Sequence, residues 1–268
     1  MSLVVRVFFT VGSPIKLHTW SGRLVSRAVG ELLEGVGIGV SHDSPRKPYT
    51  VSPVMDANGR VVNKLMPGAE YWFRASFYCR EVDCSLVTSA FSRPVVHLSG
   101  GSVFHVIRVR VGRLEPRLGN NDDSPALVHW RVRYMPTAYK FAGSVITWPS
   151  PARFLASAGK SLVRVLGGDS IEGAVMELAF HTEVARARVR QVEVRLGRGR
   201  VIHAFTGVVD YLTITSKPSL LGVLLSTANA FGVGWDRSIG LGHVTGGVLD
   251  MRSVQPVDLR VEEPTSTG

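Results

Sequence analysis

The sequence predicts an α+β protein made of two tandem ferredoxin-like domains with antiparallel sheets. Its 268 residues suit two domains of ordinary size, and apolar residues form 45% of the chain, enough for two cores. In each half the patterning gives the order strand, helix, strands, helix, strand. That split β-α-β-β-α-β order is typical of ferredoxin-like domains. We expect the helices to lie on one face of each sheet and to leave the other face open.

Alternating and four-residue patterns define the elements of the first domain, residues 1–115. Apolar residues from Trp20 to Leu32 recur at every fourth position, which predicts an amphipathic helix. Asp83 precedes a short apolar stretch and suits the N-cap of a second helix. The predicted strands cover residues 2–11, 49–55, 70–79 and 103–111, and the predicted helices cover residues 19–34 and 83–92.

A polar stretch dense in turn-forming residues, 116–126, is the predicted linker. The second domain is expected over residues 127–268. Its patterning is weaker, because residues 127–135 suit a strand or an irregular lead-in, and residues 150–159 suit a short helix or a loop. The other predicted elements are strands at 144–147, 175–179, 184–196, 202–214 and 243–250 and a helix at 219–231.

The charge balance points to a polyanionic partner. The formal net charge is +10, and 25 of the 31 basic residues are arginine, whose planar guanidinium suits phosphates and stacks on bases. A GC-rich genome or a hot habitat would also enrich arginine. No apolar run reaches the roughly 18 residues of a membrane span, and the N-terminus does not have the pattern of a signal peptide. We therefore expect an intracellular, cytoplasmic location and no membrane partner.

The two cysteines, Cys79 and Cys84, are separated by four residues. No second Cys or His pair follows at zinc-ribbon spacing, so a structural metal site is not expected. Two free thiols or a disulfide both fit this pattern.

A glycine-rich segment near the C-terminus is the most distinctive motif of the chain. Residues 232–242 place four glycines around an Arg-Ser pair. Glycine permits positive φ and close backbone approach, and such a loop can turn its N–H groups toward phosphate oxygens. The predicted RNA-binding residues of this loop are Gly232, Gly234, Arg237, Ser238, Gly240 and Gly242.

An arginine stripe is the second basic feature. If residues 184–196 form a strand, Arg186, Arg188 and Arg190 lie on one face, because side chains alternate along a strand. An RNA backbone would neutralise them, whereas a solvated strand edge would use them against aggregation. Arg131 and Arg133 repeat the pattern on a smaller scale.

Motifs for other chemistries are absent from the sequence. There is no phosphate-binding P-loop, no G-x-S-x-G nucleophile elbow and no carboxylate cluster of a two-metal nuclease. A cleavage reaction would therefore use the 2′-hydroxyl of RNA itself, without metal or cofactor, with help from proton transfer and positive charge. His42 lies in a polar loop and suits proton transfer, although a plain surface histidine has the same pattern. Lys47 follows it and suits a phosphate.

Three stretches together resemble one family. They are the G-x-G-x-x-R-S-x-G-x-G pattern of residues 232–242, the segment KPYTVS at 47–52, and the stretch FAGSVITWPSP at 141–151. In order and spacing they resemble the CRISPR-associated endoribonucleases of the RAMP superfamily that process repeat RNA. The likeness extends over most of the chain.

The resemblance implies binding of CRISPR repeat RNA within a precursor and cleavage that leaves a 2′,3′-cyclic phosphate and a 5′-hydroxyl. It implies that His42 is the general acid or base and that Lys47 stabilises the transition state. Some relatives have a tyrosine in the first helix, but the matching place here is near Gly30, and Arg23, Ser26, Arg27 or Tyr49 would have to replace it.

Effector-complex subunits are further partners in that family, and a monomer or a homodimer fits equally well. The alternatives are a non-catalytic RNA-binding subunit of the same superfamily, and a basic RNA-binding or scaffold protein unrelated to CRISPR.

Overall fold

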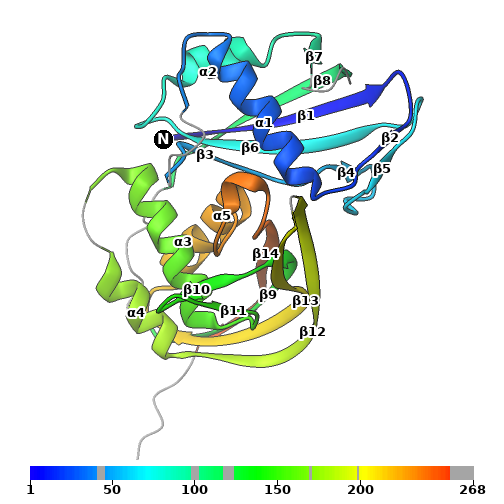
Figure 1. Ribbon diagram of the computed structural model, residues 1–268. Helices are drawn as coiled ribbons and strands as arrows, with labels where there is room; N and C mark the ends of the chain where they lie inside the picture. Colours follow the sequence, from blue (N-terminus) through cyan, green and yellow to red (C-terminus); the bar gives the residue numbers. More distant parts are fainter. Residues whose placement is uncertain (41–45, 98–102, 117–123, 169–170, 198, 254–268) are drawn as a thin grey trace, which may run out of the picture.

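Two main antiparallel sheets, one from each half of the chain, form the framework of the protein (Figure 1). The computed structural model describes residues 1–40, 46–97, 103–116, 124–168, 171–197 and 199–253. The first sheet lies above the second in Figure 1, with α1 across it, while α3 and α4 lie beside the second sheet.

The first half has eight strands and two helices among its described residues. The strands are β1 (Ser2–Val11), β2 (Ile15–Lys16), β3 (Tyr49–Val51), β4 (Met55–Asp56), β5 (Lys64–Leu65), β6 (Tyr71–Tyr78), β7 (Val95–His97) and β8 (Val103–Leu114), and the helices are α1 (Ser21–Glu34) and α2 (Cys84–Ala90). The main sheet has the order β3-β6-β1-β8-β7, with β4 also on β6 and with β2 and β5 paired separately. Asp83 caps α2 as expected, because its carboxylate accepts a hydrogen bond from the Ser85 amide.

The second half repeats this arrangement. Its strands are β9 (Ala126–Thr137), β10 (Tyr139–Phe141), β11 (Ser144–Ile146), β12 (Thr182–Gly197), β13 (Arg200–Thr215) and β14 (Val244–Ser253), and its helices are α3 (Pro151–Leu166), α4 (Glu172–Phe180), α5 (Pro218–Phe231) and the short 3₁₀ helix η1 (Arg237–Ile239). The main sheet has the order β12-β13-β9-β14, and β10 and β11 form a separate hairpin.

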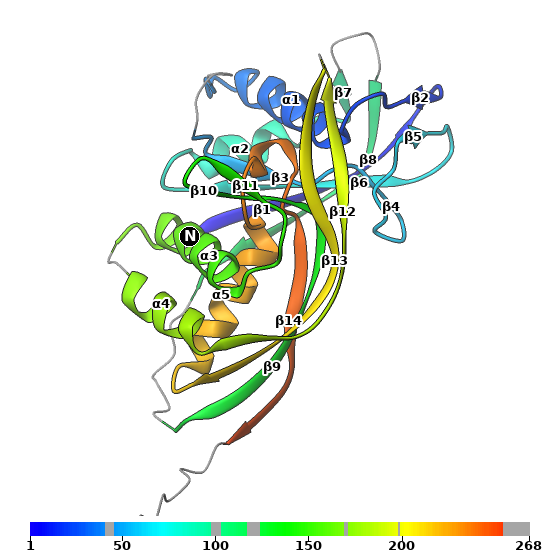
Figure 2. The same cartoon turned by 60° about the horizontal axis from the view of Figure 1, so that its bottom comes forward.

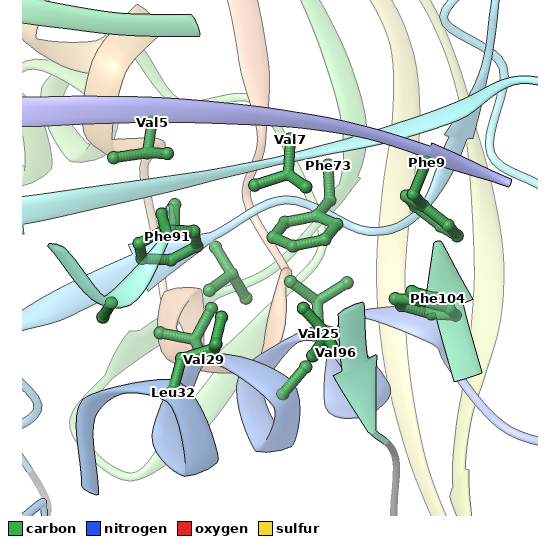
Figure 3. Packing of buried hydrophobic residues seen from close by; sticks show 14 of the residues in the cluster. Val5, Val7, Phe9, Val25, Val29, Leu32, Phe73, Phe91, Val96 and Phe104 are labelled. Carbon is green, nitrogen blue, oxygen red and sulfur yellow. The ribbon is translucent and has the colours of Figure 1, made fainter. Parts of the chain in front are cut away.

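Both sheets have the same topology. If the four main strands of each half are numbered along the chain, the order across the sheet is 2-3-1-4 in both halves. This is the arrangement of the split β-α-β unit, and it confirms the predicted α+β fold with tandem ferredoxin-like sheets. The first core fills the space between β1, β6 and helix α1 (Figure 3), and the second lies between the other sheet and helices α3 to α5.

Three predicted elements differ from the structure. Residues 175–179 form part of helix α4, not a strand; the run is too short and too apolar for its period to separate the two forms. The segment at 150–159 is a true helix that continues to Leu166, because Ser150 caps it and Gly167 ends it in the left-handed region. The strand at 49–55 is divided into β3 and β4.

Residues 117–123 of the predicted linker lie outside the described residues, and the division at 115 and 127 stays a prediction. Within the described segments, no helix combines the length and the apolar character that a membrane crossing needs.

The two halves are joined where α5 ends. Arg74 of β6 donates to the carbonyl of Asn229, and the Ser76 hydroxyl donates to the carbonyl of Ala230 at 2.6 Å. Both carbonyls belong to the last turn of α5, where the helix has no N–H donors left for its own carbonyls. Beside them Tyr78 stacks on Phe231 with ring centroids 4.2 Å apart. Side chains of the first sheet therefore cap a helix of the second half.

The glycine-rich segment that follows α5 lies against the start of α1. The Trp20 indole donates to the carbonyl of Ile239 at 2.8 Å. The tip of the β12–β13 hairpin lies beside the same residue (Figure 2), where the Trp20 amide donates to the carbonyl of Arg195 at 2.8 Å. Gly22 and Gly240 meet here with no space for a side chain. A Cβ on Gly22 would overlap the Ile239 carbonyl and lie 2.9 Å from Cα of Gly240.

We expect Gly22→Ala to lower the free energy of unfolding by about 1–3 kcal/mol, the usual effect of overpacking. The matched control is Gly30→Ala in the same helix. A Cβ there meets nothing within 4 Å, so the better helix former should stabilise the protein by about 0.5–1 kcal/mol. Urea unfolding of both variants measures the difference, and equal effects at the two positions would contradict this account of the junction.

Candidate functional site

A cleft of about 700 Å³ lies where the two halves meet. One wall is the chain entering β3, the opposite wall is α3 with the start of α4, and the glycine-rich segment closes one end. The lining residues are Arg46, Lys47, Tyr49, Thr50, Ala156, Gly159, Lys160, Val163, Arg164, Ile171, Glu172, Val175, Met176, Gly234, Trp235, Asp236, Arg237 and Ser238.

Positive charge dominates this cleft. Arginine and lysine contribute five lining residues, while Glu172 and Asp236 are the only acids among them. Burial is the main reason that the pKa of Arg237 is lowered and that the pKa of Asp236 is raised. The Arg237 guanidinium donates to the Ser161 hydroxyl and to the Gly232 carbonyl, which are both neutral. A polyanion such as a nucleic-acid backbone is the ligand that this charge favours.

Helix α3 supplies two of the cations. Ala156, Lys160 and Arg164 recur at every fourth position and so share one face of the helix. Arg164 crosses to the first half, where it donates to the carbonyl of Lys47 at 2.8 Å and forms a two-pronged ion pair with Glu81 at 2.6 and 2.8 Å. Sequence reasoning missed both cations, because the predicted helix stopped at residue 159.

Of the two predicted catalytic residues, the structure places Lys47 in the cleft wall, partly buried. His42 and its neighbour Asp43 lie outside the described residues, which resume at Arg46. The described chain on the β3 side of that gap, Arg46 and Lys47, borders the cleft directly.

Among the four residues considered in place of the absent tyrosine, Tyr49 is the one that lines the cleft. Its buried hydroxyl lies 3.3 Å from the Ser26 carbonyl and 3.4 Å from the Ser26 hydroxyl. Burial raises the pKa of Tyr49, so the phenol is neutral near pH 7. Arg23 instead donates to the carbonyl of Leu196 in the hairpin tip.

The backbone amides of the glycine-rich segment differ from the sequence prediction, which turned them toward phosphate oxygens. Its amides mostly donate within the protein: Val233 to the Gly242 carbonyl at 2.8 Å, Gly234 to the Ser157 hydroxyl at 2.8 Å, and Gly242 to the Pro136 carbonyl at 2.9 Å. Gly232, Gly240 and Gly242 do not line the cleft, whereas Gly234, Arg237 and Ser238 do. The glycines allow close packing, and side chains of the segment face the cleft.

A second basic site lies on the open face of the second sheet. Ala187 and Val189 of β12 pack into the core, so the alternating Arg186, Arg188 and Arg190 point to the opposite face, as predicted. Arg186 and Arg188 line a groove of about 590 Å³ together with Arg131 and Arg133 of β9, with Asp210 of β13 and with residues of β14. Arg190 does not line it.

Strand register explains this cluster. Arg186 is opposite Asp210, which is opposite Arg131; in the next row Arg188 and Arg133 flank Val208. Arg131 holds Asp210 by two hydrogen bonds, at 2.6 and 3.0 Å, and this contact is the main reason that the pKa of Asp210 is lowered. A single carboxylate therefore lies among four guanidinium groups of the groove.

A third set of cations went unrecognised in the sequence. Arg74, Arg6 and Arg110 occupy one row across β6, β1 and β8 of the first sheet. Arg6 lies over the Trp72 ring at 4.6 Å, and Arg108 lies over the Phe8 ring at 4.1 Å in the neighbouring row. One indication of this row was present in the sequence, because Arg6 interrupts the apolar residues of a predicted strand.

His243 joins these cations to the second half. Its Nδ1 accepts a hydrogen bond from Arg74 at 2.9 Å, because a guanidinium only donates. Burial is the largest cause that lowers the pKa of His243 well below its usual range, followed by the charges of Arg74 and Arg6. Burial also lowers the pKa of Arg74 to about 9. The imidazole is thus neutral at physiological pH.

In the segments that the structure describes, no group of three His, Cys, Asp or Glu side chains is arranged to hold a metal ion. Cys79 and Cys84 form a disulfide between the end of β6 and the start of α2. Their spacing in the sequence had fitted two free thiols equally well.

Comparison with known proteins confirms the family resemblance. Residues 133–244 match the family described as CRISPR-associated endoribonuclease Cas6. No match was found among curated proteins.

Several solved structures share the fold. A Cas6 product complex is 22% identical, with a TM-score of 0.67 and an alignment over 92% of this chain and 100% of that one. A Thermus thermophilus Cas6 is 20% identical, with a TM-score of 0.60 over 92% and 98% of the two chains. A RAMP protein that binds different RNA substrates is 12% identical, with a TM-score of 0.56 over 92% and 100%.

The buried histidine should make stability sensitive to acid. The unfolded chain binds a proton at His243 below about pH 6.5, and the folded chain does not. We expect the free energy of unfolding to fall, through this group, by up to about 1.4 kcal/mol for each pH unit below that value. His243→Gln keeps an acceptor for Arg74 and should lose this part of the slope.

Denaturant unfolding between pH 4.5 and 8 measures both slopes. The exposed His105 supplies the control, because His105→Gln should leave the wild-type slope in place. Identical slopes for the wild type and His243→Gln would show that His243 titrates normally in the folded protein.

Proposed function

We propose that this chain, whose residues 133–244 match the Cas6 family, binds CRISPR repeat RNA within precursor transcripts and cuts it in the cleft between its two sheets. The observation that carries the proposal is the composition of that cleft. Five cationic side chains line it, and Arg46 and Lys47, which follow His42 in the sequence, are two of them. A phosphodiester held there would have positive charge on several sides.

The proposed reaction uses the nucleophile of the substrate. The 2′-hydroxyl gives up its proton and its oxygen bonds to the adjacent phosphorus, the bond from phosphorus to the 5′-oxygen breaks, and that oxygen takes a proton. The products are a 2′,3′-cyclic phosphate and a 5′-hydroxyl. His42 would transfer one of these protons, and Lys47 would stabilise the charge that builds on the phosphate. These steps need no metal ion.

The proposal assigns the open face of the second sheet to the RNA backbone. Arg186 and Arg188 line a groove there, and Arg190 extends the row along β12. This face is opposite the helices that form the cleft, so an RNA that reaches both sites runs around the sheet. Arg237 and Ser238 would contact it in the cleft. Gly232, Gly234, Gly240 and Gly242 would contribute by shaping the segment.

We expect His42→Ala to abolish cleavage of repeat RNA while affinity for the RNA stays close to that of the wild type. Lys47→Ala should slow cleavage by about 10²-fold or more, the usual effect of removing one group that stabilises transition-state charge. Gel assays under single-turnover conditions with EDTA measure the rates.

The control substrate is the same RNA with a 2′-deoxyribose at the cleavage site. It should bind and remain intact, because the attacking hydroxyl is missing. Tight binding of the ordinary RNA without cleavage by the wild type would instead identify a non-catalytic RNA-binding subunit. Loss of affinity and cleavage together in His42→Ala would assign His42 a structural role.

Replacing Arg186, Arg188 and Arg190 with Gln should weaken RNA binding and flatten its dependence on salt. Each phosphate contact contributes roughly 0.7–0.9 to the slope of log K against log salt, so the slope should fall by about two to three. The matched control replaces Arg60, Lys64 and Lys217 with Gln. It removes the same net charge, and none of its residues lines the cleft or the groove. Equal slopes for the two triple variants would exclude the stripe from the RNA path.

A further inference from the structure

Glu81 lies outside the cleft, yet it is linked to two residues of the cleft wall. Its carboxylate accepts hydrogen bonds from Arg164 at 2.6 and 2.8 Å and from Arg46 at 3.1 Å. Glu81 belongs to the first half and Arg164 to α3 of the second, so this ion pair spans the junction. Arg164 is also the donor to the main-chain carbonyl of Lys47, at 2.8 Å.

We infer that Glu81 is a positioning residue for the cleavage reaction: through Arg164 it fixes the backbone of Lys47 against the cleft. This inference rests on the function proposed for the cleft. It assigns a role to a side chain that touches no substrate.

The surroundings of Arg164 make this geometry well defined. Its guanidinium lies over the Tyr78 ring at 3.6 Å, and its side chain is only 14% exposed. The guanidinium stacks on the Tyr78 ring with one face, and its edge forms bidentate hydrogen bonds with the Glu81 carboxylate. These two contacts together restrict it to one orientation. The second N–H of Nη2 then meets the Lys47 carbonyl. Ordinary surface ion pairs lack this restriction and contribute little.

Glu81 is itself held by the chain around it. Its amide donates to the Tyr78 carbonyl at 2.8 Å, and the disulfide between Cys79 and Cys84 closes the short loop that contains it. The hydrogen bond from Arg164 is the largest cause that lowers the pKa of Glu81, so the carboxylate stays ionised and available as an acceptor at neutral pH.

Glu81→Gln separates an effect on RNA attraction from an effect on the chemical step. The substitution removes a negative charge near a cationic cleft, so long-range attraction would leave RNA binding equal or tighter. Positioning predicts slower chemistry, because a displacement of about 1 Å at a reacting group can lower a rate by about 10²-fold. The expected signature is therefore a single-turnover rate reduced by about 10- to 100-fold, with unchanged or improved affinity for the 2′-deoxy RNA.

The control is Glu177→Gln, which breaks the ion pair of Glu177 with Lys217 on the surface of the second half. It should alter neither rate nor affinity. If Glu81 acts through Arg164, the double variant Glu81→Gln/Arg164→Gln should cut RNA no more slowly than Arg164→Gln alone. Additive losses, or a Glu81→Gln rate equal to that of the wild type, would overturn the inference.

A second measurement is independent of cleavage. Hydrogen exchange at the amides of Arg46 and Lys47, read by mass spectrometry, should accelerate in Glu81→Gln while exchange in α5 stays unchanged. Unchanged exchange at these two amides would exclude positioning. A wild type that fails to cut repeat RNA would refute the proposed function, and the exchange result would still decide whether Glu81 fixes this segment.

Discussion

The capping of α5 by the first sheet is the contact on which the geometry of the site depends. A buried helix end must find donors for its last carbonyls, and here Arg74 and Ser76 of β6 provide them. Because the donors and the acceptors come from different halves, the two sheets have one relative placement. The glycine-rich segment starts where α5 ends, so it too is fixed, and the cleft forms between it and the chain that enters β3.

Among the residues that the structure describes, no carboxylate pairs with the cation that this contact buries. The negative end of the α5 dipole and a neutral imidazole at His243 take the place of a counterion for Arg74. Acidic side chains at the basic sites have specific partners instead: Asp210 accepts from Arg131, and Glu81 accepts from Arg164 and Arg46. Positive charge still exceeds negative charge in the cleft and in the sheet groove, where a long polyanion would find several cations.

Local periodicity predicted the parts of this fold that depend on near neighbours. Strand β1 has the predicted bounds, and α5 begins one residue earlier than expected, because both have strong repeating patterns. The face of the arginine stripe also followed from alternation alone. What the sequence could not supply was the pairing of distant elements: the row of Arg74, Arg6 and Arg110 exists only through strand register.

The glycine-rich segment shows how a motif can mark a site without performing its chemistry. A Cβ on Gly240 would lie 2.9 Å from Cα of Gly22, and Gly240 also has a positive φ of 84°. These constraints come from packing between the halves, and they would hold for any reaction in the cleft. Lys47, which is proposed to act on the phosphate, belongs to another segment, the chain before β3, and Arg164 on α3 contacts its carbonyl. The packing requirement for glycine is separate from the choice of side chains that face the cleft, so the motif predicts where the cleft lies and not which residues act in it.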